Sequence, residues 1–219
     1  MRLFKHLTAF LILAMCWLTV AHANTSNDTG PKEAVEMAVN RVIEVLRKEG
    51  DVIRDDPDKI YGLVNEYILP HFDFDRMSYF VLGKAWKEAS EQQKENFQHE
   101  FKQLLITTYS TALSEYSTDE EILYKSVMIS PKNENIAIVP TEIKQAGAGP
   151  VSVIYRMYRS EGVWRIYDVS IEGVSLVKNY RANFAGQVRS NGLDGLIITL
   201  AGHNQPEENS AVTLQKVSQ

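Results

Sequence analysis

The sequence PVSVIYRMYRSEGVWRIYDVSIEG, residues 150–173, is the clearest indication of the fold class. It holds two runs rich in β-branched and aromatic residues, separated by the turn signal Ser-Glu-Gly at 160–162. In the first run the apolar side chains that share one face of a strand are Val151, Val153, Tyr155 and Met157. So short a connection suits an antiparallel hairpin and leaves no room for a crossover helix.

Two earlier runs extend this hairpin into a sheet. They are ILYKSVMIS at 122–130 and NIAIVPTEIK at 135–144, bounded by the turn-forming segments PKNEN and QAGAGP. We therefore expect a curved antiparallel sheet of about four strands over roughly 120–172.

Helical patterns precede the sheet, over about 31–117. One helix is expected from Pro31 to Gly50, and another from the N-cap Asp56 to Pro70. Ser90 and Gln93 form a capping box before the longest helix, roughly 91–116. Its apolar stripe, which includes Phe97, Phe101, Leu105 and Tyr109, is broad enough to predict packing across the sheet.

After Gly173 the pattern turns helical again over about 174–202, with a break at Gly192. The order helices, sheet, helices predicts one α+β domain over 24–202, with a helical subdomain on the curved sheet. Such an arrangement leaves a cone-shaped apolar pocket between helix and sheet. A filled core would give the same sequence pattern.

Both ends of the chain lie outside this domain. Basic residues in MRLFKH precede an apolar run at 7–20 and the small-x-small site Ala21-His22-Ala23, which is typical of a signal peptide. We expect cleavage after Ala23 and export, most simply to a periplasm, with an uncleaved anchor as the alternative. A lipoprotein signal at Cys16 fits badly because Met15 precedes the cysteine. The composition of 203–219 predicts a flexible tail.

Cleavage also changes the chemistry that is available. Cys16 is the only cysteine, so the exported chain can form no internal disulfide or thiolate site. Loss of Arg2 and Lys5 takes the formal net charge from −5 to about −7. An acidic exported chain is a poor candidate for binding nucleic acid.

The stretch ILPHFDFD, residues 68–75, resembles a metal or acid–base site, because His71, Asp73 and Asp75 would share a strand face. However, Pro70 ends one helix and another begins directly afterwards. Asp73 is then expected as an N-cap, Asp75 in the first helical turn, and Phe72 and Phe74 as apolar anchors. We expect no metal site, no cofactor and no catalytic residue here.

Two blocks of sequence resemble the MlaC family, also called toluene-tolerance proteins. The first block carries Leu69-Pro70, Phe72-Asp73, Leu82-Gly83, Trp86, Phe97, Phe101 and Tyr109. The second carries Trp164, Tyr167-Asp168-Val169, Glu172-Gly173-Val174-Ser175, Asn179-Tyr180-Arg181, Phe184 and 192–196.

The resemblance implies a non-enzymatic periplasmic phospholipid carrier with a nuclear-transport-factor-like fold. It implies transport between an outer-membrane lipoprotein–porin complex and an inner-membrane ABC transporter with its MCE-type subunit, which maintains outer-membrane lipid asymmetry. Phospholipid would be cargo held by its acyl chains.

The residues that we expect in the pocket are apolar or aromatic, and ordinary core packing is the alternative for each: Leu69, Phe72, Val81, Leu82, Phe101, Leu105, Tyr109, Tyr155, Tyr167, Val169 and Val174. A head-group rim is expected from Lys178, Arg181 and Arg189, with a solvated helix face as the alternative.

Two other functions stay open at this point. The same fold can host an enzyme with a pocket Asp and Tyr, in which Asp168 would be the base. The structural alternative is that Asp168 caps or hydrogen-bonds the backbone near the Glu172–Ser175 turn. A cargo-free adaptor for membrane complexes is the third possibility.

Overall fold

The computed structural model describes residues 29–54, 59, 62–114, 121–144, 147 and 149–204. The expected signal peptide at 1–23, the expected helix start at Asp56 and the tail after Asn204 lie outside the described residues. Residues 203 and 204, which we expected in the tail, are helical.

The strands form an antiparallel sheet, as the hairpin pattern predicts, but the described part of the sheet has six strands rather than about four. The order is β1-β3-β4-β5-β6, with β2 also pairing with β3. The strands are β1 Glu121–Tyr124, β2 Met128–Ser130, β3 Asn133–Lys144, β4 Val151–Ser160, β5 Val163–Ile171 and β6 Val174–Ser175.

Pro140 explains why the first expected strand divides into β1 and β2. It lies between the part of β3 that pairs with β1 and the part that pairs with β2. Proline has no N–H to donate, so regular pairing is interrupted there. Its carbonyl still accepts a hydrogen bond from the backbone amide of Lys125, at 2.9 Å.

The expected turn at 160–162 is present, and a similar turn follows β5. In both, a Glu-Gly pair takes positive φ angles: 53° and 78° at Glu161 and Gly162, and 48° and 79° at Glu172 and Gly173. Two successive left-handed residues are what a two-residue hairpin turn of type I′ requires.

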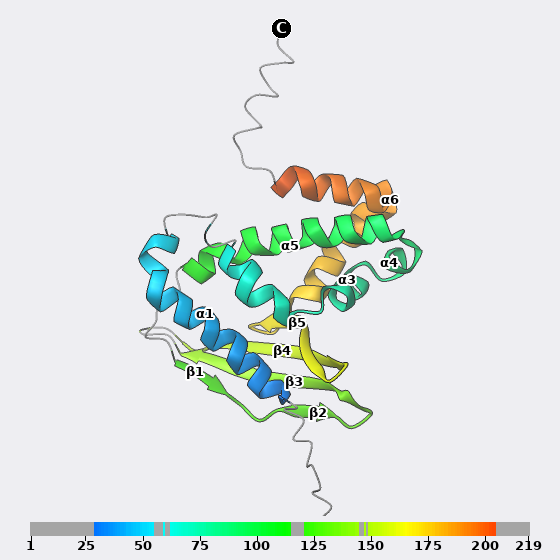
Figure 1. The fold of residues 1–219 in the computed structure, drawn as a ribbon. Coiled ribbons are helices and arrows are strands. Elements are labelled where there is room, and N and C mark those ends of the chain that lie inside the picture. The colour runs from blue at the N-terminus through cyan, green and yellow to red at the C-terminus, as the bar shows by residue number, and fades with distance from the viewer. Residues whose placement is uncertain are drawn as a thin grey trace, which may run out of the picture.

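The helices gather on one side of the sheet, with α1 against the strands (Figure 1). In chain order they are α1 Pro31–Arg54, the π-helical η1 Val64–Ile68, the 3₁₀ turn η2 Leu69–His71, α3 Phe74–Leu82, α4 Lys84–Glu88, α5 Glu91–Ser114 and α6 Leu176–Asn204. The expectation that Gly50 ends the first helix is wrong, because α1 continues to Arg54. A single glycine costs a helix only about 1 kcal/mol relative to alanine.

Several predicted helix boundaries are confirmed. Asp73 caps α3 by accepting a hydrogen bond from the backbone amide of Arg76, at 2.9 Å. The backbone amides of Ser90 and Gln93 each bond to the other's side-chain oxygen, at 3.0 and 3.2 Å. Gly192 breaks α6 in a non-helical conformation, φ 71° and ψ 179°.

The expectation that the long helix crosses the sheet is wrong: α5 packs on other helices. Its stripe belongs to a helical core formed with α3, α4 and α6. The buried residues of this helical core are Phe74, Met77, Val81, Trp86, Phe97, Phe101, Leu104, Val177, Tyr180, Phe184, Leu193, Leu196 and Leu200. After its break, α6 runs along α5 on the side away from the sheet (Figure 1).

Helix α1 takes the place on the sheet that we expected for α5. The buried residues of this second unit, the α1–sheet core, are Ala34, Val35, Ala137, Val139, Val153, Met157, Trp164, Ile166 and Val169. Phe72 and Leu176 pack against both cores and so join them. Within the described ranges, no helix is both long and apolar enough to cross a membrane.

Candidate functional site

An apolar cavity of about 220 Å³ lies between α1 and the sheet. Every lining side chain is a hydrocarbon except that of Tyr155. The lining consists of Val35, Ala38, Val39, Val42, Ile43, Ile68, Phe72, Ile122, Ile143, Tyr155 and Ile166. The site therefore offers van der Waals contact along its whole length and almost no directional bonding.

The pattern of α1 makes this helix one wall of the cavity. Apolar residues occur in adjacent pairs one turn apart, Ala38 with Val39 and Val42 with Ile43, which widens the buried face. The charged residues pair with one another elsewhere on the helix, as in the 3.2 Å contact of Lys32 Nζ with Glu36 Oε1. One face of α1 is thus left free of charge to face the cavity.

The opposite wall comes from strands and from the segment before α3. Ile122 and Ile143 are directly paired neighbours on β1 and β3. Phe72 forms a β-bridge with Ile166, and the backbone amide of Asp73 donates to the Ile166 carbonyl at 2.8 Å. This bridge fixes the Phe72 ring at the junction of the two cores.

A β-bulge in β5 keeps the cavity wall apolar. The register shifts between Arg156 and Met157, so that Tyr167 is the extra residue on β5. Residues three positions apart on a regular strand face opposite sides of the sheet. The extra residue changes this, so that Ile166 and Val169 both join the α1–sheet core.

Tyr155 supplies the one polar group of the lining. Burial raises the pKa of its phenol to about 12, and a hydrogen bond with Thr141 partly opposes that rise. The Thr141 hydroxyl itself donates to the carbonyl of Val153 at 3.0 Å. Tyr155 is therefore neutral at neutral pH, and the cavity carries no charge.

Of the pocket residues expected from sequence, the structure places Phe72 and Tyr155 in the cavity lining. Val81 and Phe101 are buried in the helical core, and Leu69, Leu82 and Leu105 pack against this core. Val169 belongs to the α1–sheet core.

The three remaining expected residues lie elsewhere. Tyr167 contacts the ring of Phe80, with centroids 5.4 Å apart, and burial raises its pKa. Burial, reinforced by the neighbouring Tyr180, raises the pKa of Tyr109 to about 12. Val174 is 58% exposed on β6 and outside the lining of the cavity. Contact of these residues with a ligand stays a prediction.

The expected head-group residues also lie apart from the cavity. Arg181 and Arg189 line a second recess of about 370 Å³, between α3–α4 and α6, that shares no lining residue with the cavity. Lys178 is exposed near the start of α6. Contact of these three with a head group stays a prediction as well.

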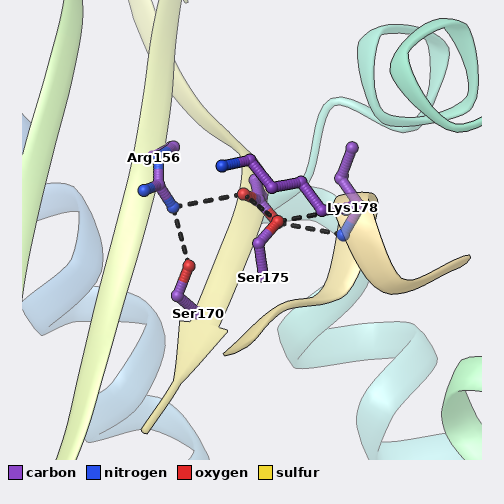
Figure 2. Close-up of polar contacts among 6 residues, drawn as sticks. Arg156, Ser170, Ser175 and Lys178 are labelled. Carbon is purple, nitrogen blue, oxygen red and sulfur yellow. Dashed lines mark hydrogen bonds and ion pairs between the residues drawn. The ribbon is translucent and has the colours of Figure 1, made fainter. Parts of the chain in front are cut away.

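Asp168 is buried and bonds to residues near the start of α6. Figure 2 shows the polar contacts around Arg156, Ser170, Ser175 and Lys178 in this network. Its Oδ2 atom accepts from Arg156 Nη1 at 3.2 Å and from the Ser175 hydroxyl at 2.7 Å. Its Oδ1 atom accepts from the backbone amide of Val177 at 3.1 Å. The expectation that Asp168 bonds the backbone is therefore confirmed, and all three donors hold it as a structural carboxylate.

The segment that resembled a metal site has a structural explanation. Asp73 caps α3, Asp75 lies in its first turn, and Gln98 Nε2 donates to Asp75 Oδ1 at 2.7 Å. Phe74 is buried and burial lowers the pKa of His71. Across the described part of the chain, no group of three His, Cys, Asp or Glu side chains could hold a metal ion.

Comparison with known proteins gives consistent matches over most of the chain. The family model described as MlaC protein matches residues 36–202. The intermembrane phospholipid transport system binding protein MlaC of Haemophilus influenzae is 28% identical over 172 residues, covering 78% of this chain and 80% of that protein. Toluene tolerance protein ttg2D of Pseudomonas putida is 25% identical over 210 residues, covering 91% of this chain and 92% of that protein.

A solved structure extends the match to three dimensions. It is the phospholipid-binding protein from Ralstonia solanacearum in complex with a phospholipid. It aligns with a TM-score of 0.73 and 28% identity, covering 80% of this chain and 96% of that one.

Proposed function

The chain belongs to the MlaC family, and from that premise we propose that it is a periplasmic phospholipid carrier whose cavity between α1 and the sheet holds acyl chain. The cavity is the observation that carries this proposal. Its lining is hydrocarbon apart from one neutral tyrosine. The similar Ralstonia solanacearum protein, solved with a phospholipid, supports it.

The energetics of lipid transfer explain why such a lining is useful. Two acyl chains carry roughly 30 methylenes, and exposing them to water costs on the order of 20–25 kcal/mol at about 0.8 kcal/mol each. A carrier lowers that cost by replacing the contacts of the bilayer with its own apolar side chains. Fixed polar groups inside the cavity would oppose this exchange.

The cavity has to widen when it is loaded. Pockets that hold drug-sized ligands are about 300–1,000 Å³, and this one is about 220 Å³. Helix α1 is the wall best suited to move, because it contributes five of the lining residues from one element. A shift of α1 away from β3 would enlarge the cavity without breaking any strand pairing.

The proposed route connects the two membranes. Cargo would pass between an outer-membrane lipoprotein–porin complex and an inner-membrane ABC transporter with its MCE-type subunit, keeping the outer membrane asymmetric. This agrees with the names of the two similar proteins, an intermembrane phospholipid transport system binding protein and a toluene tolerance protein.

Carriage needs no catalyst, and we propose that the chain is not an enzyme. The carboxylate best placed to act as a base, Asp168, is already bonded to Arg156, Ser175 and Val177. Those donors hold the side chain in place at the start of α6.

The proposal is tested by mass spectrometry of lipid extracted from the protein after native purification from a Gram-negative host. We expect phospholipid in nearly equimolar amount, and exchange with added phospholipid vesicles. A preparation that is free of lipid and cannot be loaded would instead favour the cargo-free adaptor.

A further inference from the structure

A groove at the C-terminal end of α3, between α3–α4 and α6, is lined by cations. It consists of two adjoining recesses, of about 370 and 320 Å³, that share Gly83, Lys84 and Arg181. We call it the basic groove. Its charged lining residues are Lys84, Lys87, Glu88, Arg181 and Arg189.

Four cations against one carboxylate is a strong local excess in a chain whose formal net charge is −5. Glu88 offsets only Lys84, at 3.3 Å, and both side chains are exposed. Arg181 Nη1 donates to the carbonyl of Phe80 at 3.4 Å, and no carboxylate in the described ranges pairs with Arg181 or Arg189. The positive charge of the groove is therefore available to a ligand.

The floor of the groove is apolar. Val81, Leu82, Phe184 and Val188 line it beneath the cations. Gly83, at φ 58° and ψ −111°, lets the chain turn from α3 into α4, and a Cβ there would stand 3.5 Å from Arg181 Nη2. Glycine thus keeps the backbone close to the guanidinium without strain.

We propose that the basic groove is the surface on which a protein partner docks, through a segment that carries carboxylates around an apolar side chain. The cations would meet the carboxylates, and the apolar side chain would cover the floor. Arginine in particular suits paired contacts with carboxylates. The proposal rests on the proposed function, because a carrier has to dock where it exchanges cargo.

The occupant is a protein segment rather than a membrane surface. The cations surround concave recesses, whereas a bilayer presents a broad surface. The remainder of the chain is acidic, so an anionic bilayer would repel most of it. The groove shares no lining residue with the apolar cavity, so docking can be changed without changing the cargo site.

The test uses the double variant Arg181→Glu, Arg189→Glu and a matched control, Lys132→Glu with Arg165→Glu. The control makes the same charge change in the β2–β3 turn and on β5, away from the groove. Binding of each full-length protein is measured against the purified ABC transporter complex, the purified lipoprotein–porin complex and phosphatidylglycerol vesicles, at two salt concentrations. Lipid content by mass spectrometry and far-UV circular dichroism report loading and folding.

We expect the Arg181/Arg189 variant to lose at least about tenfold in affinity for one of the complexes, with a weaker salt dependence, while the control stays within about twofold. Both variants should remain folded. Because Arg181 and Arg189 were also expected from sequence at a head-group rim, the lipid content of their variant separates docking, which leaves it unchanged, from a head-group contact, which lowers or alters it. Unchanged binding of the Arg181/Arg189 variant overturns the groove proposal while leaving the carrier function standing.

Two further outcomes also overturn the groove proposal. Vesicle binding that depends on the two arginines would make the groove a membrane contact, and a changed head-group composition would make it part of the cargo site. If the wild-type protein binds neither complex, the groove proposal and the proposed partners both fail. If it carries no lipid but still docks through the groove, only the carrier function fails.

Discussion

The backbone amide of Val177 donates to Oδ1 of Asp168 across 3.1 Å, which ties the end of β5 to the first turn of α6. Ser175, at the N-cap of α6, adds to this junction by accepting from the Lys178 amide at 3.1 Å. Two amides that the helix itself leaves unsatisfied are thereby bonded. The same carboxylate pairs with Arg156 from β4, so the sheet and α6 depend on one another.

Asp168→Ala should therefore lower the free energy of unfolding by about 3 kcal/mol, because it removes a cap and leaves Arg156 without its ion pair. Chemical denaturation measures this. Glu134→Ala is the control, since its 83% exposed carboxylate lies 3.9 Å from Arg159. A folded Asp168→Ala protein should still carry lipid; a stable variant that binds lipid normally but has lost a hydrolytic activity would instead support the enzyme.

Asp73→Ala should cost about 1 kcal/mol, the usual value of an N-cap, since the Arg76 amide loses its acceptor. Asp73→Asn keeps an acceptor oxygen and should recover most of the loss. Equal stability of the alanine and asparagine variants would contradict the cap, and would show that only the charge near Arg76 matters.

Lowering the pH should destabilise the protein through His71. Burial lowers its pKa below the ordinary value of 6.5, so between the folded-state pKa and 6.5 the unfolded chain binds more protons. The stability contributed by neutral His71 is complete above pH 6.5 and is lost as the pH falls below it. In the His71→Gln variant, the free energy of unfolding should fall less steeply as the pH is lowered below 6.5. An NMR titration giving His71 a pKa above 6.5 would contradict the prediction.

Ala38→Trp should expel cargo by filling the cavity between α1 and the sheet. Its neighbour Met37, 55% exposed, gives the control Met37→Trp, which adds a similar side chain outside the cavity. We expect the Ala38 variant to lose most of its bound phospholipid and to change in stability by about 1–3 kcal/mol at most. Equal lipid content in the two variants would mean that the cargo lies elsewhere.

The sequence predicted local features well because each depends on nearby residues. Asp73, the Ser90–Gln93 box and the break at Gly192 act within one turn of helix, and all three are confirmed. The antiparallel pairing of β4 with β5 could be predicted because the turn between them is short, with Glu161 and Gly162 at its centre. The division of one expected strand at Pro140 could also have been anticipated, since a proline cannot donate to a neighbouring strand.

Which helix covers the sheet could not be predicted in the same way. The broad stripe of α5 showed that much of this helix is buried, but Phe97 and Phe101 would be equally buried by a sheet or by Tyr180 and Phe184 of α6. The apolar stripe of a helix shows how much of its surface is buried, but it does not show whether a sheet or another helix buries it. This is why Val81 and Phe101, which we expected in the pocket, lie in the helical core.

The cavity wall on α1 had a signal that we overlooked. Ala38-Val39 and Val42-Ile43 are adjacent apolar pairs one turn apart, on a helix whose sequence contains no aromatic residue. Alanine and the β-branched aliphatic residues valine and isoleucine, when they face a sheet, leave space that aromatic residues would fill. Whether this space remains a cavity or is filled by neighbouring side chains depends on how segments distant in sequence pack together. The hydrophobic periodicity of one helix contains no information on that packing.

The most direct test of the account is photocrosslinking with a phospholipid that carries a diazirine near the end of one acyl chain, followed by peptide mass spectrometry. We expect adducts on 35–43 of α1 and on cavity-lining strand residues such as Ile143 and Tyr155, and far fewer in the Ala38→Trp variant. Adducts confined to the helical core or to the basic groove would contradict a cargo site between α1 and the sheet.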